Sequence, residues 1–128
     1  MNLVFTCGGT AGHINPAIAI ANEMRRRDPD CRVLFIGAVG HMEEKLVPQA
    51  GFELKTLPGS GLSRKKNLAG IKQNIHAVNC VLQAVKECKK IFREFKPDVI
   101  IGTGGYASFP ALYAGSKMGI PTCVHESN

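Results

Sequence analysis

Short apolar runs alternate with longer amphipathic stretches along this chain, and glycine or proline usually separates them. Leu3–Cys7 and Asp98–Gly102 are mainly apolar and too short for helices, so they predict buried strands. Between Leu68 and Phe95 apolar residues recur every three or four positions, which predicts one long helix. Its continuous core stripe would contain Ile71, Ile75, Val78, Leu82 and Val85. The whole pattern predicts strands over 3–7, 32–36, 52–57, 98–102 and 121–125, and helices over 16–27, 41–49, 68–95 and 109–118.

Because strands and helices alternate, the sequence predicts an α/β fold, a Rossmann-like, doubly wound and mostly parallel sheet in one domain over residues 1–128. Ligands of such sheets bind at the carboxyl ends of the strands. Three predicted strands end in glycine-rich or polar segments, so we expect a site where these segments meet. The side chains brought to that edge would be His13, Tyr106, Ser108, His125, Glu126 and Asn128.

The first of these segments, Cys7–Pro16, reads CGGTAGHINP and lies between a strand and a helix. Exposed N–H groups at a helix N-terminus suit a phosphate, and glycines let the backbone approach it closely. We expect Asn15 to be the N-cap and Pro16 the first helical residue. A Walker loop is excluded because no Gly-Lys-Ser/Thr follows. The alternative is a tight turn that binds nothing.

A second glycine-rich turn, Gly102–Ser108, follows a predicted strand, and we expect Ser108 to cap the next helix. Two such turns at one edge suit two anionic groups or one diphosphate. His13 and His125 are candidate general bases, because imidazole titrates nearest neutral pH. Glu126 would orient His125 or take the proton itself. The alternative for His125 is a purely structural hydrogen bond.

A nicotinamide dehydrogenase also begins with a glycine-rich turn, but two features argue against one. That fold places an acidic residue at the end of its second strand to bind the ribose 2′-hydroxyl. Here the second strand ends in GAV over residues 37–39, and the nearest acid is Glu43. The spacing of the first turn, GGTAG, also departs from G-x-G-x-x-G. We expect no cofactor.

The net charge of +6 resides in one segment, since residues 64–96 contain nine basic and two acidic residues. One interpretation is a solvated helix face. The other is a membrane surface, on which cations meet anionic headgroups while apolar side chains enter the lipid. Nucleic acid is disfavoured because no aromatic residues interleave with the basic cluster. The membrane-facing residues would be Leu62, Arg64, Lys65, Lys66, Leu68, Lys72 and Ile75.

Five scattered cysteines without Cys-x-x-Cys spacing favour a reducing compartment and argue against a structural metal site. No apolar run reaches the length of a membrane-spanning helix. We therefore expect no metal and no transmembrane segment.

Four blocks of sequence occur in a characteristic order: GGTAGH over 8–13 with NPA over 15–17, Gly37 with residues 43–52, TGGYAS over 103–108, and HESN over 125–128. Together they resemble the MurG family of bacterial glycosyltransferases, over the whole chain. Two departures are Ala11 in the first turn and Phe109 after the second, where glycines are common in that family. Ala11 fits such a turn only if its φ is negative.

The resemblance implies the N-terminal half of a two-domain GT-B glycosyltransferase. That family inverts the anomeric centre as it transfers N-acetylglucosamine from UDP-GlcNAc to an undecaprenyl-diphosphate-linked muramyl-pentapeptide in peptidoglycan synthesis. The chain would be its acceptor half, peripheral at the cytoplasmic face of the membrane and inactive without a C-terminal donor domain. Alternatives are the acceptor subunit of a split transferase and a non-catalytic, phosphate-recognising membrane module.

The resemblance also implies roles for single residues. The catalytic candidates are His13, Glu126 and His125. Donor contacts would come from Thr10, Ala11, Gly12 and Asn128. The acceptor diphosphate would contact Gly9, Gly12, His13, Gly104, Gly105, Tyr106 and Ser108.

Overall fold

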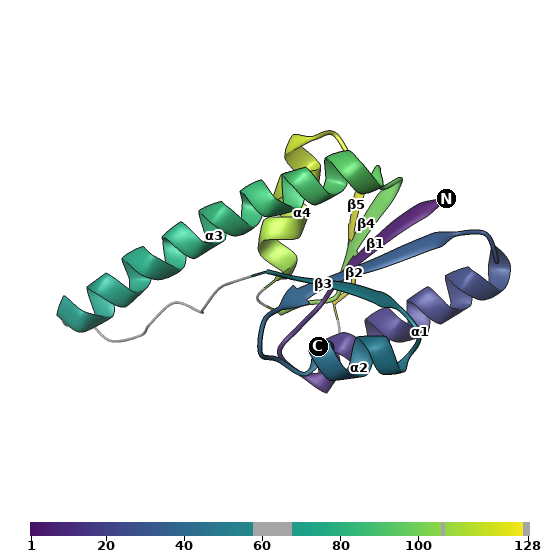
Figure 1. Cartoon of the computed structure of the whole chain (residues 1–128), viewed down its shortest axis with the longest axis horizontal. Coiled ribbons are helices and arrows are strands. Elements are labelled where there is room, and N and C mark those ends of the chain that lie inside the picture. The colour runs from purple at the N-terminus through teal and green to yellow at the C-terminus, as the bar shows by residue number, and fades with distance from the viewer. Residues whose placement is uncertain (58–67, 106, 127–128) are drawn as a thin grey trace.

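The computed structural model describes residues 1–57, 68–105 and 107–126, without the side chains of 68–74, 76 and 77. Five strands form one sheet in the order β3-β2-β1-β4-β5, and every neighbouring pair is parallel (Figure 1). The α/β class and the parallel sheet expected from the sequence are thus confirmed. The strands are β1 (Asn2–Thr6), β2 (Arg32–Ala38), β3 (Glu53–Leu57), β4 (Val99–Gly102) and β5 (Thr122–Val124).

Helices cover both faces of this sheet. Leu3 and Phe5 of β1 point to one face, where they pack with Ile14 of α1. Val4 of β1 points to the other face, where it packs with Phe92 of α3. Successive side chains of the central strand point to opposite faces and are buried on both, which produces two cores, one under α1 and α2 and one under α3 and α4. The helices are α1 (Ala11–Arg27), α2 (Glu43–Gln49), α3 (Leu68–Phe95) and α4 (Ser108–Lys117).

The first helix begins earlier than the sequence suggested. Thr10, in an extended conformation, is the N-cap, and Pro16 is the sixth residue of α1 rather than its first. The expectation for Asn15 and Pro16 was wrong because Ile14 is already fully buried, so the apolar face starts before the proline. Ala11 lies in the first helical turn with a negative φ, so alanine fits there in place of the glycine common in the resembled family.

The long helix α3 is only partly packed. Its C-terminal half, around Cys88 and Phe92, lies in the core, whereas its N-terminal half extends beyond the sheet (Figure 1). At about 1.5 Å per residue, 28 residues span roughly 42 Å, much longer than any strand here. The expected core stripe was therefore wrong along this overhang, where Ile75, Val78 and Leu82 are 50–57% exposed.

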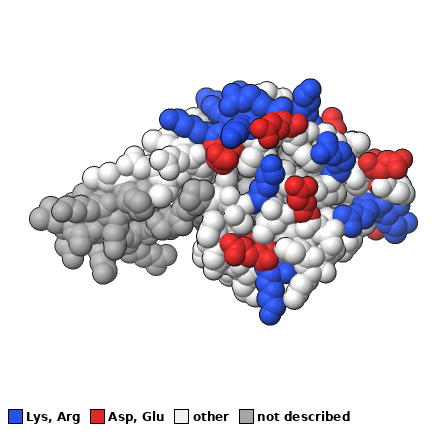
Figure 2. Space-filling view, viewed as in Figure 1, with Lys and Arg blue, Asp and Glu red and all other residues white. Residues whose placement is uncertain are grey.

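The Lys and Arg side chains of α3 that the structure describes gather over its C-terminal half, whereas residues 78–85 carry no charged side chain (Figure 2). Despite its length, α3 is not apolar enough to cross a bilayer, and neither is any other helix in the described ranges.

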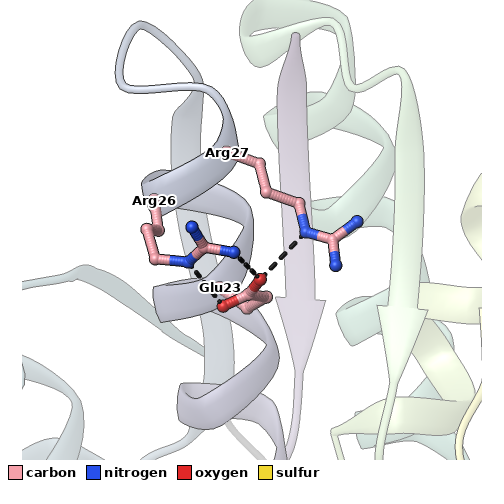
Figure 3. A network of polar contacts seen from close by, with 3 residues as sticks. All are labelled: Glu23, Arg26 and Arg27. Atoms are coloured by element: carbon pink, nitrogen blue, oxygen red, sulfur yellow. Dashed lines mark hydrogen bonds and ion pairs between the residues drawn. The ribbon is translucent and has the colours of Figure 1, made fainter.

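Two of the three arginines that end α1 form a small ion-pair network (Figure 3). Arg26 donates to both carboxylate oxygens of Glu23 at 2.5 and 3.0 Å, and Arg27 donates to one at 2.9 Å. Arg25 instead places its guanidinium 4.0 Å from the centre of the Phe52 ring. Each arginine therefore has a structural partner, as expected for cations at a helix C-terminus.

These hydrogen bonds, first from Arg26 and then from Arg27, lower the pKa of Glu23 from 4.5 to about 2. Because the folded-state pKa is depressed, the stabilisation is fully present above pH 4.5 and disappears as the pH falls toward about 2. A carboxyl-detected NMR titration should give a Glu23 midpoint near 2. Arg26→Ala should raise that midpoint more than Arg27→Ala. An ordinary glutamate midpoint in the unsubstituted chain would contradict the network.

Candidate functional site

Two glycine-rich turns lie side by side at the carboxyl edge of the sheet. One follows β1 and the other follows β4, and these strands pair so that Thr6 is opposite Gly102. Beyond the strands, the Thr103 N–H donates to the Thr6 carbonyl at 3.0 Å and continues the ladder by one residue. The turns therefore meet at their bases, as the sequence predicted.

The turns interlock because the second one has no Cβ where they touch. Gly104 and Gly105 have φ values of +113° and +95°. A Cβ on Gly105 would lie 2.7 Å from the Gly8 nitrogen and closer still to its carbonyl oxygen. A Cβ on Gly104 would lie 2.7 Å from Cδ2 of the His13 ring. Glycine is therefore required at both positions by contact as well as by conformation.

His13 is held in the first turn of α1 with a defined ring orientation. Its Nδ1 lies 3.1 Å from the Gly8 carbonyl oxygen and 3.5 Å from Oγ1 of Thr10, and its own carbonyl accepts a 2.6 Å hydrogen bond from Thr103. A carbonyl oxygen only accepts, so Nδ1 of the neutral ring carries the hydrogen. The other nitrogen, Nε2, then has a free lone pair, as a general base requires.

A buried carboxyl group lies behind the first turn. Glu43 is 0% exposed, and its Oε1 accepts from the Gly9 N–H at 3.2 Å while its Oε2 accepts from the Ala38 N–H at 2.9 Å. It also raises the pKa of the neighbouring Cys7 thiol, although burial is the larger cause of the shift to about 12. Sequence reasoning named Glu43 as the acid nearest the second strand, in the argument against a dehydrogenase, and within one block of the family resemblance, and it missed this role.

Two hydrogen-bond donors that were expected to bind a diphosphate donate instead to groups of the protein itself. The Gly9 N–H donates to Glu43, and Ser108 Oγ, which is buried, donates toward the carbonyls of Gly104 and Thr6 at 2.8 and 3.1 Å. Ser108 is the first residue of α4 and not its cap, so that expectation was wrong. The N–H groups left without intrahelical acceptors at the start of α1 belong to Ala11 and Gly12.

The remaining candidates follow β5. The His125 N–H donates to the Gly102 carbonyl at 2.8 Å, so this exposed residue lies beside the start of the second turn. Glu126 comes next and is also exposed. Thus His13 and His125 flank β4 along the same edge. Six candidates lie outside the described residues, namely Tyr106, Asn128, Leu62, Arg64, Lys65 and Lys66, and so do the side chains of Leu68 and Lys72.

Two hollows of about 410 and 430 Å³ lie elsewhere, between β3 and α3. Lysine and glutamate both line them, including Lys86, Lys90 and Glu87, and no residue of either glycine turn does. Charges of both signs in shallow hollows give no preference for an anion, so the glycine turns remain the candidate site.

Residues 3–128 match the glycosyltransferase family 28 N-terminal domain. The chain belongs to this family. A relative from Limosilactobacillus fermentum, 44% identical over 128 residues, is named UDP-N-acetylglucosamine--N-acetylmuramyl-(pentapeptide) pyrophosphoryl-undecaprenol N-acetylglucosamine transferase. A protein of the same name from Porphyromonas gingivalis is also 44% identical. This family 28 chain is fully covered in both matches but spans only about a third of either relative, 34% and 33%.

Solved structures are also similar to this chain over nearly its whole length. MurG from Acinetobacter baumannii superposes with a TM-score of 0.80 and 26% identity, covering 98% of this chain and 34% of that one. UDP-GlcNAc 2-epimerase from Neisseria meningitidis, bound to UDP-GlcNAc, gives a TM-score of 0.61 at 15% identity, covering 97% and 32%. The second likeness concerns the fold alone.

The close contact between the two turns predicts how far an added methyl group at Gly105 would destabilise the folded chain. Gly105→Ala should lower the free energy of unfolding by about 2 kcal/mol or more, because Cβ would both strain φ and strike the Gly8 backbone. Gly119→Ala is the matched control, since its φ is +76° but nothing lies within 4 Å of the new Cβ. It should cost about 1 kcal/mol, from conformation alone. Urea unfolding measures both, and equal losses would contradict the close contact.

Proposed function

We propose that this chain is the acceptor-binding half of an inverting N-acetylglucosaminyltransferase. The enzyme transfers N-acetylglucosamine from UDP-GlcNAc to the undecaprenyl-diphosphate-linked MurNAc-pentapeptide. The observation that carries the proposal is the pair of interlocked glycine turns against the His13 ring, in a family 28 chain 44% identical to relatives so named. The experiments below test the base and the membrane surface separately.

Anion binding would use the start of α1. The N–H groups of Ala11 and Gly12 lack intrahelical acceptors and lie at the positive end of the helix dipole. Phosphate groups of the acceptor, and on the other side those of the donor, would bind there together with Thr10, Tyr106 and Asn128.

His13 is the proposed base. The acceptor hydroxyl oxygen attacks the anomeric carbon of the donor sugar, and the bond from that carbon to UDP breaks with its electron pair leaving on UDP. Nε2 of His13 takes the hydroxyl proton, because Nδ1 is engaged with the Gly8 carbonyl. His125 with Glu126 is the second candidate, along the same edge with β4 between it and His13.

The donor half would lie outside this sequence. The chain spans about a third of its relatives, and in the proposal a C-terminal domain supplies most contacts to UDP-GlcNAc. Residues 1–128 would form one acceptor domain that is inactive alone. A longer two-domain protein is favoured over a split transferase, because the relatives that match over the whole chain are single longer proteins.

The overhang of α3 would meet the cytoplasmic face of the membrane. Ile75, Val78 and Leu82 offer apolar surface to the lipid, and the basic residues from Arg64 to Lys72 would meet anionic headgroups. The protein would thus be peripheral, close to its lipid-linked acceptor.

His13→Ala should lower kcat by about a hundredfold or more, the usual range for a lost general base. The assay uses this chain joined to the C-terminal domain of the Limosilactobacillus fermentum relative, with UDP-GlcNAc and a short-chain acceptor diphosphate. His41→Ala, at an exposed histidine outside the two turns, should leave the rate unchanged. A loss below tenfold in the folded His13 variant would remove it from the role of base.

Replacing Ile75, Val78 and Leu82 together by serine should weaken sedimentation of the chain with phosphatidylglycerol vesicles by about tenfold or more, because the apolar contact is lost. Charge reversal at Arg64, Lys65 and Lys66 should also weaken it. Val39→Ser is the control, since Val39 is equally exposed but lies in the turn after β2. Unchanged sedimentation of both the serine and the charge-reversed variants would mean that residues 64–82 form only a solvated face.

A further inference from the structure

We propose that Glu43 is a positioning residue that sets the tautomer of His13. It would do so through one peptide group, the one that joins Gly8 to Gly9. The catalytic meaning of this inference rests on the proposed function, whereas the structural effect can be measured without any activity.

The peptide group between Gly8 and Gly9 is held from both sides. Its N–H, on Gly9, donates to Oε1 of Glu43 at 3.2 Å, and its carbonyl, on Gly8, faces Nδ1 of His13 at 3.1 Å. A trans peptide is planar, with N–H and C=O pointing in opposite directions. Because Glu43 accepts from the N–H of this peptide group, the carbonyl of the same group points the opposite way and faces the imidazole.

Glycine makes this peptide able to rotate. Residues on both sides of it lack a Cβ, and Gly9 has a φ of +85° with open space where its Cβ would be. Rotation by half a turn would point the Gly8 carbonyl at Glu43 and the Gly9 N–H at His13. The ring nitrogen would then have to accept, which requires the other tautomer, with the hydrogen on Nε2.

The carboxyl group of Glu43 opposes that rotation. Both of its oxygens accept backbone N–H groups, and a carbonyl turned toward them would be repelled, with no water available at a residue that is 0% exposed. Its carbons also fill the space beside Gly8 and Gly37, within about 3.2 Å of where Cβ atoms would be. The side chain is thus fixed between the ends of β1 and β2.

Glutamine at this position would remove the preference. Its amide presents one oxygen and one NH₂ group, and the NH₂ group can donate to a Gly8 carbonyl turned toward it. Glu43→Gln therefore keeps the shape and permits both orientations of the peptide. Loss of the Nδ1–H tautomer would leave Nε2 protonated and unable to accept a proton.

The test is the ring tautomer of His13, read from two-bond proton–nitrogen correlations of the ¹⁵N-labelled chain at alkaline pH. The unsubstituted chain should show the Nδ1–H form, and Glu43→Gln should show a substantial population of the Nε2–H form. Amide exchange at Gly9, whose N–H loses its carboxylate acceptor in the rotated form, should accelerate about tenfold, while the Ala38 N–H keeps the glutamine oxygen as its acceptor. Glu43→Asp, which keeps the carboxyl group, should restore part of the original tautomer.

Glu44→Gln is the matched control. This exposed neighbour also accepts a backbone N–H, from Gly40 at 2.8 Å, but does not touch the glycine turn. It should leave the His13 tautomer unchanged.

An unchanged tautomer in folded Glu43→Gln, with faster exchange at Gly9, would overturn the inference and leave Glu43 a purely structural residue. Should that variant not fold, the unsubstituted chain still decides, because an Nε2–H tautomer there would overturn it too. A failure of the proposed function, seen as full activity of His13→Ala, would leave the tautomer result standing.

Discussion

The carboxyl edge of this sheet depends on the close contact of two stretches of backbone. Gly105 lies against the Gly8 peptide so tightly that no Cβ fits between them, and Gly104 does the same against the His13 ring. Protein interiors tolerate such contacts only where the atoms interdigitate without overlap. The sheet supplies the alignment, since β1 and β4 are direct neighbours in register. The His13 ring therefore lies where α1 places it and is packed against the backbone of both turns.

The first turn has two chemically different sides. One side faces Glu43, which takes up the Gly9 N–H inside the protein. The other side presents the start of α1, where the N–H groups of Ala11 and Gly12 have no intrahelical acceptor. An acidic side chain beneath an anion site would be unfavourable if it faced the anion directly. Here backbone donors face it on the inner side, so the acid shapes the turn without occupying the outer surface.

The sequence predicted the alternation of strands and helices, the parallel sheet and the meeting of the two turns, because each follows from local apolar periodicity and glycine placement. It misplaced the start of α1, since Ile14 is drawn into the core before Pro16. It also placed Ile75 in the core, because periodicity reveals an apolar face but not whether the sheet is long enough to cover it. The role of Glu43 depends on contacts 34 residues apart in the chain, which no local pattern encodes. The signal that could have found it is the glycine at the end of both neighbouring strands.

The pairing of β1 with β4 also determines at which stage of folding the two glycine turns come together. Leu3 lies opposite Val99, so the first and fourth strands join across almost a hundred residues of sequence. Contacts of such long sequence separation carry a large loop-closure entropy and form late and slowly. A partly synthesised or partly folded chain contains His13 and the first turn but not the Gly104 and Gly105 surface that orients the ring. The backbone surface that orients the His13 ring is thus complete only when β4 has joined β1.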